Sequence, residues 1–289
     1  MPSPPALRSR GRHPRRAAGL LVALLVLSTV PALLAGCARA PAEPSGPWNV
    51  VVLLVDTLRA DRLPFHGYPR DTAPTLAALA GESVVFERAR AQAGCTFPSV
   101  VSLLTSRPAS EIMAGIDRHG MAVPEGLPYL PAILRERGWA TAAVSASIVV
   151  RDTPSQINHQ GGYGRGFDVF DESCLERSAA CVNARAVPLL DELPEPFFLY
   201  LHYLDPHAPY RPPSWHERRF ARSRPERRWV RRGDPGPLFR TLYEGEPGGE
   251  IERAELRHLR DLYDEEILFF DRQLAQLQAE LRDRDLLER

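Results

Sequence analysis

The chain lacks lysine altogether, because all 36 of its basic residues are arginine. This absence excludes every mechanism that needs a lysine nucleophile or a lysine Schiff base. The 36 basic residues balance 36 acidic ones, and a net charge of zero argues against a general nucleic-acid binder. The hydrophobic and charged fractions, 44% and 25%, exclude a disordered chain, a collagen-like repeat and a polytopic membrane protein. A length of 289 residues leaves room for one large domain or two small ones.

Acidic residues are missing from the start of the chain, where the first one is Glu43. Five arginines come first, followed by an apolar run from Ala17 to Ala35 and then Gly36-Cys37, a pattern typical of an export signal. The string Leu-Ala-Gly-Cys resembles a bacterial lipobox, which implies that residues 1–36 are removed as a signal peptide and that Cys37 is acylated. We therefore expect an exported lipoprotein, anchored in a membrane and facing the periplasm or the cell surface. The alternative is an uncleaved anchor, since about 19 apolar residues nearly span a bilayer.

Cysteine is scarce, with four residues in all. Cys174 and Cys181 are close in sequence, and an oxidising compartment would allow them to close a small loop by a disulfide. The alternative is a pair of reduced surface thiols. No second Cys or His pair lies nearby at ligand spacing, so the two do not predict a zinc site.

Apolar runs and amphipathic segments alternate after residue 48 and predict the fold class. Residues 37–48 are rich in Pro and Ala and form a linker, which leaves residues 49–289 as the folded domain. Three strands separated by helices predict an α/β fold with a mostly parallel central sheet flanked by helices on both faces. The first strand, a continuous β-branched run, is expected to be central in the sheet. The predicted strands are 49–55, 141–147 and 197–203, and the predicted helices are 74–81, 98–106, 129–138, 177–190 and 251–284.

Candidate site residues follow two of these strands and precede one helix. Ligand sites of open α/β sheets lie beyond the carboxyl ends of the strands, where Asp56 directly follows the first strand. Its alternative role is to cap the following turn. Thr96 stands just before a helix predicted to begin at Pro98, near the positive end of the helix dipole, where backbone N–H groups bind phosphate or sulfate oxygens. Its alternative role is an ordinary N-cap.

The third strand is followed by a polar loop. His202, Asp205 and His207 are costly in a core and natural in a polar site, so we take all three as candidate substrate-binding residues. The alternative is that each histidine is a satisfied core or surface residue. Further along, residues 211–232 contain nine arginines. This segment is either a solvated insertion or a basic rim that attracts an anionic substrate or anionic lipid headgroups.

Four blocks of sequence together resemble the sulfatase family of the alkaline-phosphatase superfamily. They are NVVVLLVDTLRADRL, TFPSVVSLLTS, GRGFDVFDE and FFLYLHYLDPHAPY, in the order in which the family has them. The resemblance implies an enzyme that acts on sulfate or phosphate esters of a small molecule, glycan or lipid, with no role for nucleic acid. It also implies a divalent cation (Ca, Mg, Mn or Zn), with Asp56, Thr57 and Thr96 as metal ligands. Thr96 would be the catalytic nucleophile, and His207 would contact the transferred group as a second catalytic residue.

Two departures from the family pattern shape what we expect. The family's Cys-x-Pro-x-Arg motif, whose Cys becomes formylglycine, falls here on Thr96 to Val100, and Cys95 is one residue too early. Thr at this position resembles the phospho-transferring relatives, namely lipoteichoic-acid synthases and phosphoethanolamine transferases, which form a phospho-Thr intermediate. A later Asp-His/Asn-Gly segment that completes the family's metal site is absent from residues 49–289, so the catalytic domain is expected to be C-terminally truncated. The alternative function is therefore an inactive, anion-binding lipoprotein.

Overall fold

The computed structural model describes residues 46–114, 121–174, 176, 178–245 and 251–287. The chain divides into two units, Met1–Gly46 and Pro47–Arg289, and the fold described is that of the second. The predicted signal peptide (1–36), Cys37 and most of the linker lie outside the described residues. In the part of the chain that is described, no helix is both long enough and apolar enough to cross a membrane.

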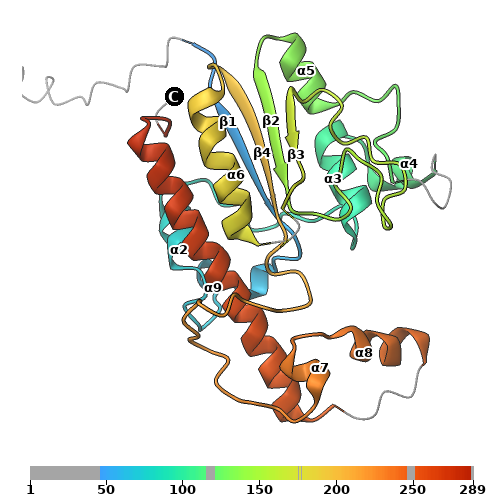
Figure 1. The fold of residues 1–289 in the computed structure, drawn as a ribbon, viewed down its shortest axis with the longest axis vertical. Helices are drawn as coiled ribbons and strands as arrows, with labels where there is room; N and C mark the ends of the chain where they lie inside the picture. The colour runs from blue at the N-terminus through green and yellow to red at the C-terminus, as the bar shows by residue number, and fades with distance from the viewer. Residues whose placement is uncertain (1–45, 115–120, 175, 177, 246–250, 288–289) are drawn as a thin grey trace, which may run out of the picture. The chain divides into compact units, whose positions relative to one another are not determined.

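A parallel sheet of four strands forms the centre of the unit (Figure 1). The strands are β1 (Val50–Val55), β2 (Ala140–Ser145), β3 (Val169–Asp171) and β4 (Phe197–Tyr203), in the spatial order β1-β4-β2-β3. All pairs are parallel, and Val55 of β1 is in register with Tyr203 of β4. The predicted α/β fold with a parallel sheet is therefore confirmed.

The sequence predicted a central position for the first strand, and among the described strands this prediction was wrong. β1 lies at the edge of the sheet and is half-buried, whereas β4 is buried along its whole length between β1 and β2. Both runs are continuously apolar, so composition alone does not distinguish an edge strand from a central one.

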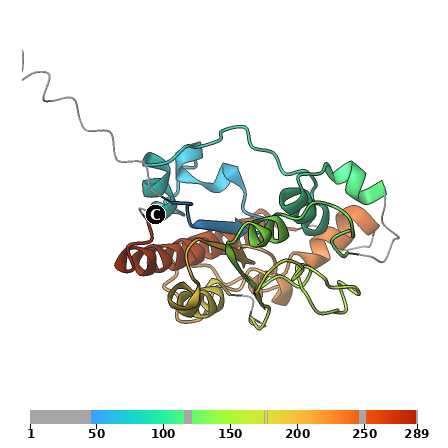
Figure 2. The same ribbon diagram turned by 90° about the horizontal axis from the view of Figure 1, so that it is seen from above.

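Helices cover both faces of the sheet, and β4 shows how. Its odd-numbered residues, such as Leu199 and Leu201, pack with α6 (Ala179–Glu192) and α9 (Arg253–Asp283). Its even-numbered residues, Phe198 and Tyr200, pack with α3 (Thr96–Thr105) and the neighbouring helices α4 (Ala109–Ala114) and α5 (Leu130–Glu136). This alternation is the period of two expected when a strand is buried on both faces. Figure 2 shows α6 and α9 together along one side of the sheet.

The remaining elements connect these layers. α2 (Pro74–Gly81) packs on α9, where the N–H groups of Thr75 and Leu76 donate to the Asp271 carboxylate. After β4 the chain runs as a long coil to α7 (Arg228–Arg231), which packs on α9, and then to α8 (Gly236–Phe239) and the π-helical turn η3 (Arg240–Glu244). Two short 3-10 turns, η1 (Ala60–Arg62) and η2 (Pro64–His66), follow β1.

Candidate active site

Polar side chains meet where β1 and β4 end. The Asp56 N–H donates to the Tyr203 carbonyl at 2.9 Å, which continues the strand pairing one step beyond Val55. Asp56 therefore lies at the carboxyl edge of the sheet, where α/β folds bind ligands.

Two side chains that are distant in sequence, Thr96 and His202, converge on one oxygen atom of Asp56 at this edge. The Thr96 hydroxyl donates to Asp56 Oδ2 at 3.0 Å. The His202 Nε2 lies 3.5 Å from the same Oδ2, a long contact at the limit of hydrogen bonding. Thr96 comes from the start of α3, Asp56 from the end of β1 and His202 from β4. The fold thus brings together three of the residues that the sequence proposed as site candidates.

The Asp56 carboxyl group is held in its ionised form. It is only 9% exposed, and burial by itself raises the pKa of a carboxyl group. The hydrogen bonds and charge of His202, the hydrogen bond from Thr96 and the charge of His207 together outweigh burial, so the pKa of Asp56 is lowered. At neutral pH an ionised carboxylate thus accepts the hydrogen bond from the Thr96 hydroxyl.

His202 is oriented by a buried tyrosine. Its ring is fully buried, and its Nδ1 lies 2.9 Å from the Tyr200 hydroxyl. Burial raises the pKa of Tyr200 well above its ordinary value, so the phenol keeps its proton. The Tyr200 hydroxyl thereby fixes the orientation of the ring, so that Nε2 is the nitrogen that faces Asp56.

Thr96 is the first residue of α3, and the helix begins two residues earlier than the sequence predicted. Cys95 is the N-cap and provides no side-chain hydrogen bond to the helix. Pro98 fits inside the first turn because a proline there loses an N–H that would have no helical acceptor. The proposed alternative, in which Thr96 is the N-cap, is therefore wrong. Its hydroxyl is directed to Asp56 instead, beside the positive end of the helix.

Thr57 and His207 border this trio. Thr57 has a φ of 56°, a left-handed conformation that is rare for a β-branched residue, and its carbonyl accepts the Tyr263 hydroxyl at 2.7 Å. Its side chain is exposed. His207 is also exposed, with Nδ1 2.6 Å from the Ala208 carbonyl, and its charge reaches Asp56.

Asp205 lies apart from the trio, in a buried carboxyl pair that sequence reasoning missed. Its Oδ2 accepts the Ala179 N–H at 2.7 Å at the start of α6, and its carboxyl group is hydrogen-bonded to Glu266 of α9. The two are 7% and 4% exposed. Burial, followed by the charge and hydrogen bond of Asp205, raises the pKa of Glu266 to about 9. Glu266 carries no signal in the sequence, because it is one of many charged residues in the amphipathic segment that forms α9.

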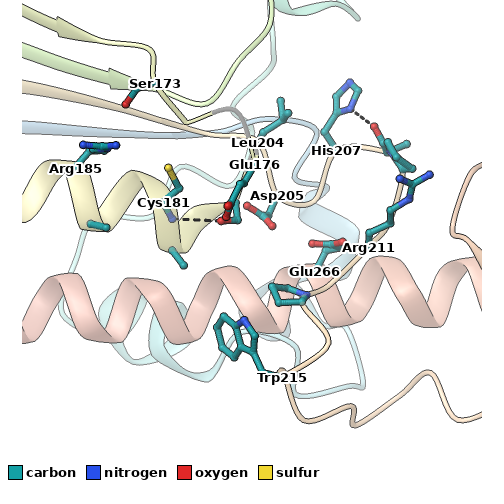
Figure 3. Close-up of a pocket in the computed structure, with 16 residues that line it drawn as sticks. Ser173, Glu176, Cys181, Arg185, Leu204, Asp205, His207, Arg211, Trp215 and Glu266 are labelled. Carbon is teal, nitrogen blue, oxygen red and sulfur yellow. Dashed lines mark hydrogen bonds between the residues drawn. The ribbon is translucent and has the colours of Figure 1, made fainter.

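A cavity of about 1050 Å³ lies over this carboxyl pair. It is bounded by the first turns of α6 and by the coil after β4, which includes His207. Figure 3 shows the carboxyl groups of Asp205 and Glu266 directed toward one another within it. Arg185, Arg211 and Trp215 also line the cavity. Its wall includes Cys181, which the structure joins to Cys174 in a disulfide.

The donor set around Asp56 fits part of a cation site. Asp56 and Thr96 offer hard oxygen atoms 3.0 Å apart, one of them on an ionised carboxylate. Calcium takes about six to eight oxygens and magnesium about six, so these residues supply only part of a coordination shell. Among the described residues there is no group of three His, Cys, Asp or Glu side chains that would hold a metal ion.

Comparison with known proteins identifies the family of this chain. The family model for Sulfatase matches residues 48–289. The chain belongs to the sulfatase family. A sulfatase with 25% identity over 236 residues is human iduronate 2-sulfatase, and the match spans 70% of this chain and 42% of that protein. The family predicted from the four sequence blocks is thereby confirmed.

Solved structures of the superfamily share the fold. The C-terminal periplasmic domain of EcEptC from Escherichia coli, in complex with Zn, has a TM-score of 0.52 at 19% identity, over 83% of this chain and 62% of that one. BT4656 in complex with its substrate D-glucosamine-2-N,6-O-disulfate has a TM-score of 0.57 at 15% identity, over 82% and 63%. This sulfatase-family chain thus spans less than two thirds of the length of these relatives.

Proposed function

We propose that this protein is an enzyme that cleaves or transfers a sulfate or phosphate ester, with Thr96 as its nucleophile. The observation that carries the proposal is the 3.0 Å hydrogen bond from the Thr96 hydroxyl to the ionised Asp56 carboxylate. An alcohol is a weak nucleophile until a neighbouring group orients it and accepts its proton. Asp56 is placed to do both, at the edge of the sheet where ligands bind.

Each residue around Thr96 has a part in the proposed reaction. Thr96 Oγ1 forms a bond to the phosphorus or sulfur atom while the bond to the leaving alcohol breaks. The hydroxyl proton passes to Asp56 Oδ2, and His207 donates a proton to the leaving oxygen. Backbone N–H groups at the start of α3 stabilise the oxygen atoms of the transferred group. Water or an acceptor alcohol then displaces Thr96 and gives its proton to His207, while Asp56 returns a proton to Thr96 Oγ1 and restores the hydroxyl.

A divalent cation would complete this site. When bound by the oxygens of Asp56 and Thr96, it would lower the pKa of the hydroxyl and polarise the ester. Solved relatives support this assignment, since EcEptC was determined in complex with Zn. Thr57 stays a candidate ligand, because its exposed side chain follows Asp56 directly.

Threonine at the nucleophile position favours phosphate esters over sulfate esters. The sequence has Thr96 where formylglycine-dependent sulfatases have the modified cysteine. A solved structure with a similar fold is the lipooligosaccharide phosphoethanolamine transferase EptA of Neisseria meningitidis, with a TM-score of 0.54 at 18% identity, over 84% of this chain and 40% of that one. That likeness shows a shared fold, and the transfer of a phospho group is the part we propose for this chain.

Turnover of three chromogenic esters tests the proposal on the gene product at its native length. The probes are p-nitrophenyl phosphate, bis(p-nitrophenyl) phosphate and p-nitrophenyl sulfate, each with added divalent metal. Thr96→Ala is expected to lower kcat/KM by at least about 1,000-fold, because the nucleophile is lost, whereas Thr96→Ser keeps a hydroxyl and part of the activity. Thr105→Ala is the matched control, since that hydroxyl donates only to the Val101 carbonyl within the same helix.

Mass spectrometry of quenched reactions should find a phospho or sulfo group on the peptide that contains Thr96. Unchanged turnover in Thr96→Ala would show that another residue is the nucleophile. The second candidate function, an inactive anion-binding protein, is favoured by the partial cation shell around Asp56. It would be supported if all three esters resist cleavage while inorganic phosphate binds to the wild type more tightly than to Thr96→Ala.

The proposed location is an outer surface of a bacterial membrane, with acylated Cys37 as the anchor. The support is the basic and apolar leader that ends at Cys37. Metabolic labelling with a fatty acid is expected to mark the wild type, and Cys37→Ser should lose the label. Retention of the label in Cys37→Ser would contradict the anchor.

A further inference from the structure

The coil after β4 holds an excess of positive charge that the rest of residues 49–289 does not share. Residues 211–232, here named the Arg-rich segment, contain nine arginines and two glutamates, while the whole chain has no net charge. Such a local excess creates a potential that attracts anions over a distance set by the salt concentration.

Most of this charge is not neutralised by the protein. Arg219 pairs with Asp71 at 3.1 Å and Arg227 with Glu255 at 3.3 Å. The other seven arginines of the segment are exposed and have no carboxylate within ion-pair distance among the described residues, and Arg218, Arg222, Arg224 and Arg228 are four of them. The pKa of the neighbouring His258 is lowered, mainly by burial and also by the positive charge of Arg218. These like charges repel one another in the free protein, so the segment is suited to binding an anion.

The backbone of the segment is nevertheless held in place by contacts with α9. The buried Glu265 carboxylate of α9 accepts the N–H of Ala221 at 2.9 Å and lies 3.2 Å from His216 Nε2. Val230 of α7 is fully buried, and α7 packs on α9. The guanidinium groups therefore project from a backbone that is already ordered, which lowers the entropy cost of binding.

The large cavity lies between His207 and the first residues of this surface. His207 is the one proposed catalytic residue in its lining, which also includes Arg211 and Trp215 of the Arg-rich segment. The Trp215 side chain is 69% exposed even though its ring lies 5.4 Å from that of Phe269. An exposed aromatic ring beside polar groups is a typical platform for a sugar ring.

We propose that the Arg-rich segment binds an anionic polymer, a chain with repeated sulfate or phosphate groups, and that one ester of this polymer reaches Thr96 from the side of the cavity that His207 lines. This inference rests on the proposed function, because it assigns the carrier of the ester. An anionic membrane is less well matched to the surface. Membrane-surface binding uses an amphipathic helix with an outward apolar face, whereas the one helix in this segment, α7, has four residues and buries its valine.

The test compares two variants that lose the same charge. The first replaces four of the unpaired arginines of the segment, Arg218, Arg222, Arg224 and Arg228, by glutamine. The control replaces four exposed arginines elsewhere that form no ion pair among the described residues: Arg88, Arg90, Arg137 and Arg282. Binding is measured to heparin, to long-chain polyphosphate and to vesicles with phosphatidylglycerol, over a range of salt concentrations.

We expect the first variant to bind heparin or polyphosphate about 10- to 100-fold more weakly at low salt, while the control stays near the wild type. The slope of log Kd against log salt should fall by about 3, because four fewer cations release counterions from the polymer. Turnover of small chromogenic esters should be unchanged, and Thr96→Ala should bind the polymer as the wild type does. Preference for heparin over polyphosphate would identify sulfate as the recognised group, and the reverse would identify phosphate.

Equal weakening in both variants, or binding to vesicles alone, would overturn the proposal. If neither the wild type nor any variant cleaves the small esters, while polymer binding still depends on the arginines, the proposed enzyme is refuted and the proposed binding surface is supported. Thr96-dependent turnover without any polymer binding would refute the surface alone.

Discussion

Replacing Glu266 by glutamine is expected to make the protein more stable at neutral and alkaline pH. Glu266 shares a hydrogen bond with Asp205 in a buried pair, and its pKa in the folded protein is raised from 4.5 to about 9. The other charged or titratable side chains that line the same cavity are His207 and Arg211 on the loop after β4, Arg185 on α6, and Glu176. At neutral pH the folded state therefore keeps a proton on Glu266 that the unfolded chain has lost.

The sign of the pH dependence follows from this difference. A carboxyl group whose pKa is raised by folding stabilises the protein fully below the pKa of the unfolded chain, near 4.5, and loses that contribution as the pH rises to about 9. Each pKa unit corresponds to about 1.4 kcal/mol, so the wild type should lose on the order of 4 kcal/mol between about pH 5 and pH 8 from this group. The Glu266→Gln amide donates a hydrogen bond to Asp205 at every pH and avoids this loss.

Urea unfolding followed by tryptophan fluorescence measures the effect at several pH values. The neighbouring Glu265→Gln is the matched control, because Glu265 is also buried but has its pKa lowered by His216 and two backbone N–H groups, despite the opposing effect of burial. That variant should lose about 1–3 kcal/mol at neutral pH, where the charged form is stabilised. If Glu266→Gln kept the same dependence of unfolding free energy on pH as the wild type, Glu266 would be ionised in the folded protein and the reasoning would be wrong.

Three further outcomes are expected. Thr57→Gly should raise the free energy of unfolding by about 1 kcal/mol in urea titrations, because a β-branched residue at φ 56° is strained, and no gain would mean that the backbone there is relaxed. Removal of the disulfide by Cys174→Ser with Cys181→Ser should cost about 2 kcal/mol, as expected for a short loop between residues seven positions apart, and an unchanged urea midpoint would contradict this. Removal of divalent cations with a chelator should abolish ester turnover, and added Ca, Mg, Mn or Zn should restore it, whereas full activity in the chelator would contradict a metal-assisted Thr96.

Long apolar and amphipathic segments were predictable because their signal is local. The third predicted strand has the same bounds as β4, and the helix predicted at 251–284 became α9 at Arg253–Asp283. β3 was missed as an element because its three residues are too few to show a period. The start of α3 was misplaced by two residues because proline is compatible with several positions in a first turn.

The residues of the candidate site were likewise predictable only in part. Asp56, Thr96 and His202 were identified because they follow a buried strand, precede a helix or end a strand. Asp205 was identified by the same reasoning, yet it lies with Glu266 over the cavity, since side chains of one loop point to different sides of the sheet edge. Glu266 was missed because its environment comes from α6 and the loop after β4, which are distant in sequence.

By itself, the amino-acid sequence determined which segments form strands and helices, which family the chain resembles and which polar residues stand at strand ends, because these depend on periodicity and on neighbours along the chain. Only the tertiary structure decided that the Thr96 hydroxyl lies 3.0 Å from Asp56 and that Glu266 keeps a proton beside Asp205. Those properties depend on how β1, β4, α3 and α9 pack, and packing sets the distances and the burial that control hydrogen bonds and pKa values.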